Sequence, residues 1–232
     1  MKMEKVRSIL YKAKEEKRWL LEPEAMEILK TYEISVPEHR FINDIKEAVK
    51  SAESIGYPVV LKIVSPAILH KSDADCVKLN LTNGEEVRNA YQEILTNAEK
   101  FDPKAEIRGI IIYPMVKAGL ETIIGITEDA QFGPAAMFGL GGVFVEVLKD
   151  VAFRILPLTL DDALAMIKEI KGYQLLCGIR GEKTKDIISL AETIVKVSKL
   201  CTDFPEIKEI DLNPTYVYEQ CVTVVDARIR VG

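Results

Sequence analysis

The chain has 232 residues, of which 48% are apolar, and a formal net charge of −5, so it can bury a sizeable core as one large domain or two small lobes. Charges of both signs are interspersed, without the basic stripe that a nucleic acid or an acidic membrane surface requires, so we expect neither partner. No apolar run approaches the ~20 residues of a membrane-spanning helix, and the charged first residues lack a signal peptide's apolar core, so we expect a cytoplasmic protein.

The first half of the chain alternates between predicted helices and predicted strands. A charged amphipathic helix is expected over residues 3–18, and Pro23 begins a second helix, where its missing N–H costs nothing. A third helix runs from Asn43 as N-cap to Gly56, and a fourth covers 85–101. Strands are expected near 36–41, at 57–64 and at 76–81.

The second half is richer in strands. Helices are expected at about 160–171 and 183–201, and β-rich segments cover 107–116, 120–129, 133–142 and 151–158, with a final hairpin over 206–218 and 221–229. This order predicts an α+β fold of two lobes with a cleft between their sheets. The expected division is an N-terminal helix at 1–20, a first lobe at 21–108 and a second lobe at 109–232.

The segment "VVLKIVSPAILHKSDADCVKLNL", residues 59–81, places one lysine in an apolar strand and a histidine in the loop that follows. Burying the Lys62 ammonium is costly unless it meets a partner or a ligand phosphate, although an edge-strand lysine can also extend its charge to solvent. His70 is one of two histidines in the chain, with His39. From the segment alone, His70 is either a chemical group or an ordinary solvated loop residue.

Three glycines in "FGLGGVFVEVLKD" follow a predicted strand and permit close approach of the backbone to an anion: Gly139, Gly141 and Gly142. A turn of a hairpin explains the same pattern, and the established phosphate-loop motifs are absent. Glu146 and Arg154 lie beyond the glycines on candidate strands. They form either an exposed cross-strand pair or groups that face the cleft.

The segment "EIDLNP" carries two candidate metal ligands. Asp211 and Asn213 are two residues apart on one predicted strand, so they share a face, and Asp226 belongs to the neighbouring run "VTVVDARI". Magnesium prefers a few carboxylate or amide oxygens together with phosphates and water. The alternative is that these side chains only cap the ends of a hairpin.

In this order, Lys62, the 65–75 loop, "GLGG" and the "DLNP" and "VVDAR" segments resemble the ATP-grasp family. More narrowly, the chain resembles the small β subunits of archaeal NDP-forming acyl-CoA synthetases, especially the ADP-forming acetyl-CoA synthetases, and is similar to the nucleotide-binding part of succinyl-CoA synthetases. The resemblance covers nearly the whole chain, from "LLEPEAMEILKTYEI" to "EIDLNPTYVY". It implies an ATP-grasp fold with a nucleotide cleft between the sheets of two lobes.

The resemblance also implies roles for particular residues. His70 matches the phosphorylatable histidine of the small subunit, and Lys62 would hold the nucleotide phosphates, with Lys71 offsetting charge on the phosphoryl oxygens. Glu121 would lie near the ribose. Magnesium would be held by Asn213 and Asp226 with Asp211 adjacent, adenine would meet the backbone of Pro114, Met115 and Val116, and further nucleotide contacts are expected from Gly141, Gly142, Glu146 and Arg154.

The implied reaction converts acetyl-CoA, ADP and phosphate to acetate, ATP and CoA through phosphohistidine. The sequence shows no CoA-binding Rossmann motif, so a CoA-binding α subunit is expected, in an α2β2 heterotetramer. Two alternatives are a stand-alone ATP-grasp carboxylate ligase, which would not need His70, and a noncatalytic nucleotide-sensing subunit. The acyl group, the choice between ADP and GDP and the physiological direction are not predicted.

Two positions depart from the family pattern. Where the loop usually has a small residue and a Gly pair after HKSD, this chain has Ala74, Asp75 and Cys76. The loss of both glycines reduces backbone freedom and brings a carboxylate toward the expected phosphate path. The second departure is Pro114, which stands where an acidic residue often recognises the adenine amino group.

Overall fold

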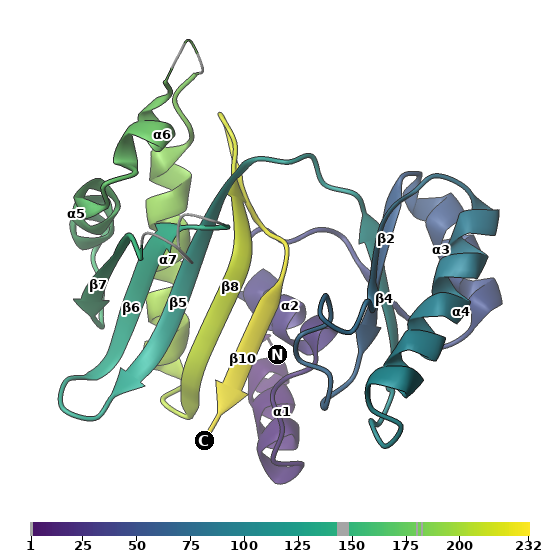
Figure 1. The fold of residues 1–232 in the computed structure, drawn as a ribbon. Helices are drawn as coiled ribbons and strands as arrows, with labels where there is room; N and C mark the ends of the chain where they lie inside the picture. The colour runs from purple at the N-terminus through teal and green to yellow at the C-terminus, as the bar shows by residue number, and fades with distance from the viewer. Residues whose placement is uncertain (1, 143–148, 180, 182) are drawn as a thin grey trace. The chain divides into compact units, whose positions relative to one another are not determined.

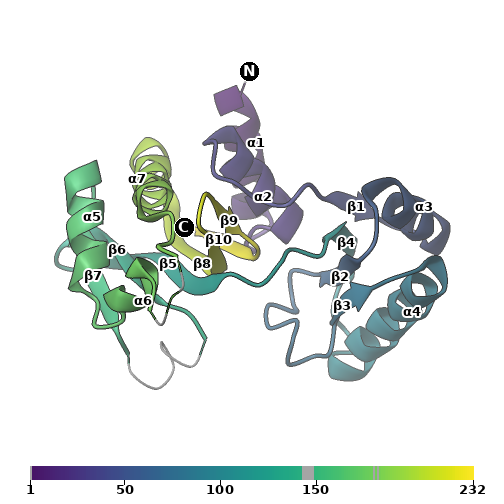
Figure 2. The same cartoon turned by 90° about the horizontal axis from the view of Figure 1, so that it is seen from above.

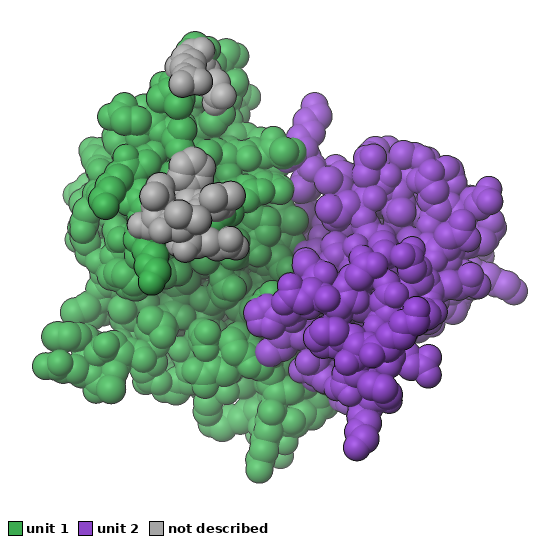
Figure 3. All heavy atoms as spheres, viewed as in Figure 1, with its two compact units in different colours: residues 1–20, 24–36, 118–232 green, residues 21–23, 37–117 purple. Residues whose placement is uncertain are grey.

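The computed structural model describes residues 2–142, 149–179, 181 and 183–232. The chain forms two compact units, which Figure 3 distinguishes by colour. The larger unit comprises residues 1–20, 24–36 and 118–232, and the smaller unit comprises 21–23 and 37–117. Each unit has its own sheet and its own hydrophobic core.

The smaller unit is an antiparallel sheet covered on one face by two helices. The sheet has the order β1 (Arg40–Ile42), β4 (Gly109–Pro114), β2 (Val59–Val64) and β3 (Val77–Leu81). Helices α3 (Ile45–Ile55) and α4 (Gly84–Phe101) pack together against it (Figure 2). Their N-caps are Asp44 and Asn83, whose side chains accept hydrogen bonds from the first free backbone N–H groups of each helix.

The larger unit contains a six-stranded antiparallel sheet among its described residues (Figure 1). The strand order is β10 (Ala227–Val231), β8 (Ile207–Val217), β5 (Leu120–Asp129), β6 (Gly133–Leu140) and β7 (Val151–Ile155), and β9 (Val222–Val224) pairs with β8. The helices of this part of the chain are α1 (Lys2–Glu15), α2 (Glu22–Thr31), α5 (Leu160–Glu169), α6 (Tyr173–Cys177) and α7 (Ile187–Asp203).

The two faces of the larger sheet differ in character. Ile124, Phe138 and Leu212 are register neighbours on β5, β6 and β8, and all three are buried in the core under the helices. Because side chains alternate along a strand, their neighbours Gly125, Met137 and Asp211 point to the opposite face. Of the candidate site residues, Asp211 therefore lies on the face away from that core.

The expected α+β composition and most of the expected elements match the structure, with differences at several boundaries. The N-cap of α3 is Asp44 and not Asn43, because the Asp44 carboxylate accepts the N–H groups of Lys46 and Glu47. The short α6 was not among the expected elements, and the strand expected over 221–229 is divided into β9 and β10. Strand β4 begins at Gly109, where the second lobe was expected to start, but it pairs with β1 and β2 and so belongs to the smaller unit.

No helix within the described residues is long and apolar enough to cross a membrane.

Candidate nucleotide and phosphoryl-transfer site

Three charged side chains from separate segments meet inside the smaller unit. The Nζ atom of Lys62 lies 3.0 Å from Oε1 of Glu22, and Nζ of Lys71 lies 3.0 Å from Oε2 of the same carboxylate. The side-chain exposures are 7% for Lys62, 10% for Lys71 and 1% for Glu22. The structure thus brings together the two lysines that the resemblance implies for phosphate binding, and adds a glutamate to them.

The strand position explains why Lys62 is buried. All six residues of β2 are buried, and Leu61 and Ile63 face the core under α3 and α4. Lys62 points to the other face of the sheet, where its ammonium lies 5.2 Å from the centre of the Tyr113 ring. The lysine is therefore held by a carboxylate and an aromatic face and does not extend to solvent as an edge-strand lysine would.

His70 lies in a tight turn directly before Lys71, and its side chain is exposed. The backbone closes the turn with hydrogen bonds from Ala74 N–H to the His70 carbonyl, 3.3 Å, and from Cys76 N–H to the Lys71 carbonyl, 2.8 Å. The turn directs two successive side chains differently, because Lys71 is buried and contacts Glu22, whereas His70 is exposed to solvent. An exposed imidazole beside a buried cation can receive a group from outside the chain.

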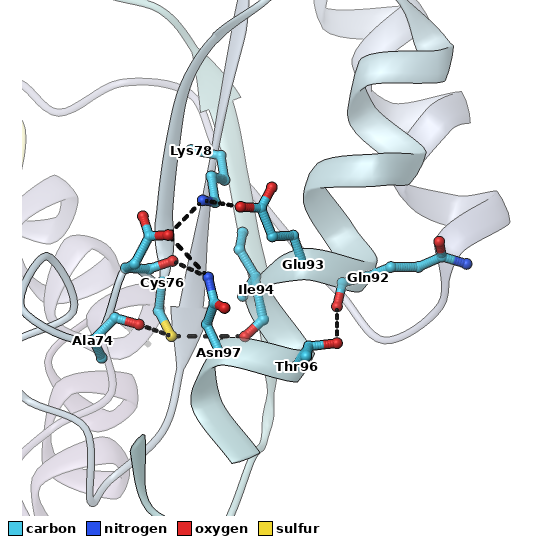
Figure 4. Close-up of polar contacts among 9 residues, drawn as sticks. Ala74, Cys76, Lys78, Gln92, Glu93, Ile94, Thr96 and Asn97 are labelled. Carbon is cyan, nitrogen blue, oxygen red and sulfur yellow. Dashed lines mark hydrogen bonds and ion pairs between the residues drawn. The ribbon is translucent and has the colours of Figure 1, made fainter. Parts of the chain in front are cut away.

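The departure from the family's usual Gly pair is accommodated by contacts to β3 and α4. Asp75 adopts a positive φ of 49°, the region glycine favours, and its carboxylate lies 2.9 Å from Lys78 Nζ. The Asn97 amide donates to the Asp75 carbonyl and carboxylate, 3.0 Å each, and Cys76 Sγ lies near the carbonyls of Ala74 and Ile94 (Figure 4). The Asp75 carboxylate is thus bound by Asn97 of α4. Burial raises the pKa of the neighbouring Cys76 thiol.

The larger unit brings Glu121 and the glycine pair together. The N–H of Gly141 donates to the Glu121 carbonyl, 2.8 Å, and a Cβ added at Gly142 would lie 3.0 Å from Oε2 of Glu121. Gly142 has a φ of 59°, which favours glycine. The Tyr216 hydroxyl lies 3.4 Å from Oε1 of Glu121. Three residues that the sequence analysis assigned to the nucleotide are therefore neighbours.

The expected metal ligands lie on adjoining strands. Asp211 and Asn213 are on β8, and the Asn213 N–H donates to the carbonyl of Asp226, 3.2 Å away, just before β10. Asn213 is exposed and both aspartates are half-buried. Among the described residues no group of three or more His, Cys, Asp or Glu side chains could hold a metal. A magnesium ion needs only one or two protein carboxylates, so this set of oxygen donors fits the ion together with phosphates and water.

The backbone expected to meet adenine follows β4. Pro114 ends the strand, and the Met115 N–H donates to the Pro58 carbonyl, 2.8 Å. Met115 is exposed and Val116 is half-buried, and the smaller unit ends one residue later. The assignment of Pro114, Met115 and Val116 to adenine stays a prediction.

Two further candidates stand apart from these groups. The guanidinium of Arg154 lies 2.5 Å from the Glu169 carboxylate in α5, and the residue pairs in register with the buried Ala136. It therefore lies on the helix-covered face of the sheet, opposite to Asp211, and this position lends no support to a nucleotide contact. Glu146 lies outside the described residues.

Glu22 was not among the residues selected from the sequence. An acidic residue before Pro23 is typical of the first turn of a helix, where its negative charge interacts favourably with the helix dipole. The sequence pattern therefore gives no sign that Glu22 is buried. The available signal was the pair of lysines itself, because two buried ammonium groups require a nearby anion.

The chain is similar to known proteins over nearly its whole length. A family model described as an ATP-grasp domain matches residues 12–231. The chain is 56% identical over 225 residues to the β subunit of acetate–CoA ligase [ADP-forming] I from Pyrococcus furiosus, with 97% of each chain covered.

Solved structures of an acetyl-coenzyme A synthetase 1 from Ca. Korarchaeum cryptofilum are also similar. One, in complex with coenzyme A and Ca-AMPCP, is 47% identical with a TM-score of 0.95, over 97% of this chain and 99% of the other. A second contains coenzyme A and Mg-AMPPCP, with its phosphohistidine segment pointing towards the nucleotide binding site. It is 45% identical with a TM-score of 0.86, over 98% of this chain and 100% of the other. The chain belongs to the ATP-grasp family and, within it, to the family of β subunits of ADP-forming acetate–CoA ligases.

Proposed function

We propose that this chain is the nucleotide-binding β subunit of an ADP-forming acetyl-CoA synthetase, an acid–thiol ligase. The complete reaction converts acetyl-CoA, ADP and phosphate to acetate, ATP and CoA. The contribution of this chain is the last part, in which a phosphoryl group passes through a histidine to ADP. Family membership and the residues described above support this assignment.

The single observation that carries the proposal is the position of His70 beside the buried lysine pair. A neutral imidazole nitrogen of His70 attacks the phosphorus of a phosphohistidine on the partner, forming one P–N bond as the other breaks. A terminal oxygen of ADP then attacks the same phosphorus, the bond to His70 breaks, and ATP forms. Each step forms one bond to phosphorus and breaks another, and both imidazoles end neutral. No atom changes its oxidation state, so the transfer needs no oxidant or reductant.

In such a reaction the protein lowers the activation barrier mainly by stabilising the charge on the oxygens of the transferring phosphoryl group. Lys71 follows His70 directly, and its ammonium shares the Glu22 carboxylate with Lys62. In the proposed transfer these two cations would offset the charge on the phosphoryl oxygens. Asn213, Asp226 and Asp211 are the residues that would hold magnesium. The ion, when bound, neutralises charge on the nucleotide phosphates.

The expected partner is a CoA-binding α subunit, because the related Pyrococcus protein is named as a β subunit. The exposed position of His70 is consistent with a group that must be reached from another chain. We propose an α2β2 heterotetramer in the cytoplasm. The related structures contain AMPCP with calcium or AMPPCP with magnesium, in agreement with ATP or ADP and Mg²⁺ as the ligands of this chain.

The test is an ATP-formation assay with the purified chain and its co-purifying partner, supplied with acetyl-CoA, ADP, phosphate and Mg²⁺. ATP is expected only when both chains are present, and Lys62→Met is expected to lower its rate at least 100-fold. Lys5→Met is the matched control, because it also removes a lysine charge, but from an exposed ion pair with Glu27. Full ATP formation by this chain without any partner would contradict the proposal.

A further inference from the structure

Glu22 is the most buried charged side chain of the lysine cluster. Its carboxylate is 1% exposed, whereas the side chains of Lys62 and Lys71 are 7% and 10% exposed. Each carboxylate oxygen lies 3.0 Å from a different ammonium group. Of the three side chains, the two lysines are therefore more accessible than the glutamate to an anion that arrives from solvent.

The charges of the three side chains do not balance. Two ammonium groups share one carboxylate, so the cluster of Glu22, Lys62 and Lys71 carries one net positive charge where little solvent reaches it. A buried ion pair that loses one partner is strongly destabilised, because the remaining charge is uncompensated. Without the carboxylate, the repulsion between two neighbouring buried cations would be less well compensated, so both lysines would be held less firmly.

The three residues come from separate segments of the chain. Lys62 is in the middle of β2, Lys71 is in the turn after His70, and Glu22 is the first residue of α2. Pro23 fixes the backbone at the start of that helix, which limits the positions available to the glutamate. The carboxylate consequently links the strand lysine to the lysine beside the histidine.

We propose that Glu22 is a positioning residue, which holds Lys62 and Lys71 as one two-ammonium site for phosphoryl oxygens. The inference rests on the proposed function, since that function supplies the phosphates. Glu22 acts through the lysines and makes no contact with the reacting atoms. Its loss should weaken contacts with phosphate groups and leave the contacts with the adenosine part of the ligand unchanged.

This difference can be measured by comparing ADP with adenosine. Calorimetric titration of the full-length chain in Mg²⁺ gives the Kd for each ligand in the wild type, Glu22→Gln, Glu22→Asp and Glu24→Gln. Glu24 is the matched control, because it is two residues away on the same helix and pairs with Arg18 at 2.7 Å.

We expect Glu22→Gln to weaken ADP binding at least tenfold and to change adenosine binding less than twofold. Glu22→Asp, which keeps the charge, should recover part of the loss, and Glu24→Gln should bind both ligands as the wild type does. Equal weakening of ADP and adenosine would assign Glu22 a role in folding alone and overturn the inference. Unchanged or tighter ADP binding in Glu22→Gln would overturn it as well.

A second measurement does not depend on nucleotide. Amine-reactive acetylation of the ligand-free chain, followed by peptide mass spectrometry, reports how firmly each lysine is held. Lys62 and Lys71 should react at least fivefold faster in Glu22→Gln than in the wild type, and at the wild-type rate in Glu24→Gln. Unchanged acetylation rates in Glu22→Gln would refute the positioning role of Glu22. In the calorimetric experiment, a wild type that binds ADP no better than adenosine would refute the proposed function.

Discussion

The backbone N–H of Asn213 donates a hydrogen bond to the carbonyl oxygen of Asp226, at 3.2 Å. The bond joins the "DLNP" segment in β8 to the residue that precedes β10. Asp211 lies two residues before Asn213 on the same face of β8, and it pairs in register with Arg228. The bond therefore brings Asp226 beside Asn213, although the two residues are 13 positions apart in the sequence.

This relationship predicts the effect of removing one donor. Asp226→Asn keeps the size of the side chain but removes its charge, so Mg²⁺ should be held less well. We expect the Mg²⁺-dependent part of ADP affinity to fall at least tenfold, which corresponds to about 1.4 kcal/mol. Calorimetric titration with ADP, carried out once in Mg²⁺ and once in EDTA, measures this Mg²⁺-dependent part of the affinity.

The control for the metal site is Asp161→Asn, which removes an exposed carboxylate from the first turn of α5. Its Mg²⁺-dependent affinity should equal that of the wild type. If Asp226→Asn binds ADP with the same Mg²⁺ dependence as the wild type, the site does not include Asp226.

Gly142 offers a test of the contact with Glu121. Gly142→Ala and Gly133→Ala both place a methyl group on a residue of positive φ, 59° and 76° respectively. Each should lose about 1 kcal/mol of stability for this reason. Only the Gly142 methyl would approach Glu121, at 3.0 Å from Oε2, whereas the methyl at Gly133 would meet nothing within 4 Å.

We therefore expect the two variants to unfold similarly in urea while only Gly142→Ala weakens ADP binding. A weaker affinity in both variants, or in neither, would argue against a role of this turn beside Glu121 in binding the nucleotide.

Asp75 tests how the turn after His70 tolerates the absence of the Gly pair. Asp75→Gly loses the contacts with Lys78 and Asn97 but relieves the backbone at positive φ, so the two effects partly cancel. Asp75→Ala loses the contacts and keeps the strained backbone. We expect Asp75→Ala to be less stable than Asp75→Gly by about 1 kcal/mol in urea unfolding.

Asp75→Asn is the matched control, since asparagine tolerates positive φ and its side-chain oxygen can still accept from Asn97. It should be more stable than Asp75→Ala. If the alanine variant were as stable as the glycine variant, the φ of 49° would carry no energetic consequence.

The pH dependence of stability should include a contribution from Asp203. Hydrogen bonds from Lys199 and then from Tyr32 hold the pKa of the Asp203 carboxyl below its usual range. The unfolded chain lacks these bonds and binds the proton more tightly. The stabilisation is therefore present above the unfolded pKa of about 4 and is lost as pH falls through the lower folded pKa.

Asp203→Asn should reduce the free energy of unfolding at pH 7 by less than about 1 kcal/mol, because the Lys199 pair is partly exposed. The difference from the wild type should shrink as pH falls below 4, in urea titrations at several pH values. Lys199→Met removes the largest cause of the lowered Asp203 pKa. Its stability difference from the wild type should also shrink as pH falls below 4. A difference that grows toward acid pH would contradict this explanation.

The order of strands and helices was predictable because most elements carry local signals. The apolar runs of β2 and β5 and the cap at Gly56 can be recognised without tertiary contacts. The division into units was less accessible. Whether β4 pairs with β1 and β2 or begins a second sheet depends on hydrogen bonds between residues distant in the sequence, which no local pattern encodes.

The candidate site shows the same limit. Lys62 was recognisable as a charge within an apolar strand, but its carboxylate partner is 40 residues away in the sequence. Arg154 and Asp211 both looked like strand residues near the site, yet the register of the sheet turns Arg154 to α5 and Asp211 to the opposite face. A side chain's face depends on register, and one residue of shift reverses it.

The most direct test of the central claim is whether His70 carries a phosphoryl group between the partner and ADP. The chain and its co-purifying partner are mixed with acetyl-CoA, labelled phosphate and Mg²⁺ without ADP, and acid-labile label is located by mass spectrometry, with His70→Ala as the control. We predict label on His70 that passes into ATP when ADP is added, and none on this chain in His70→Ala. ATP formation with label on the partner but never on this chain would contradict the account.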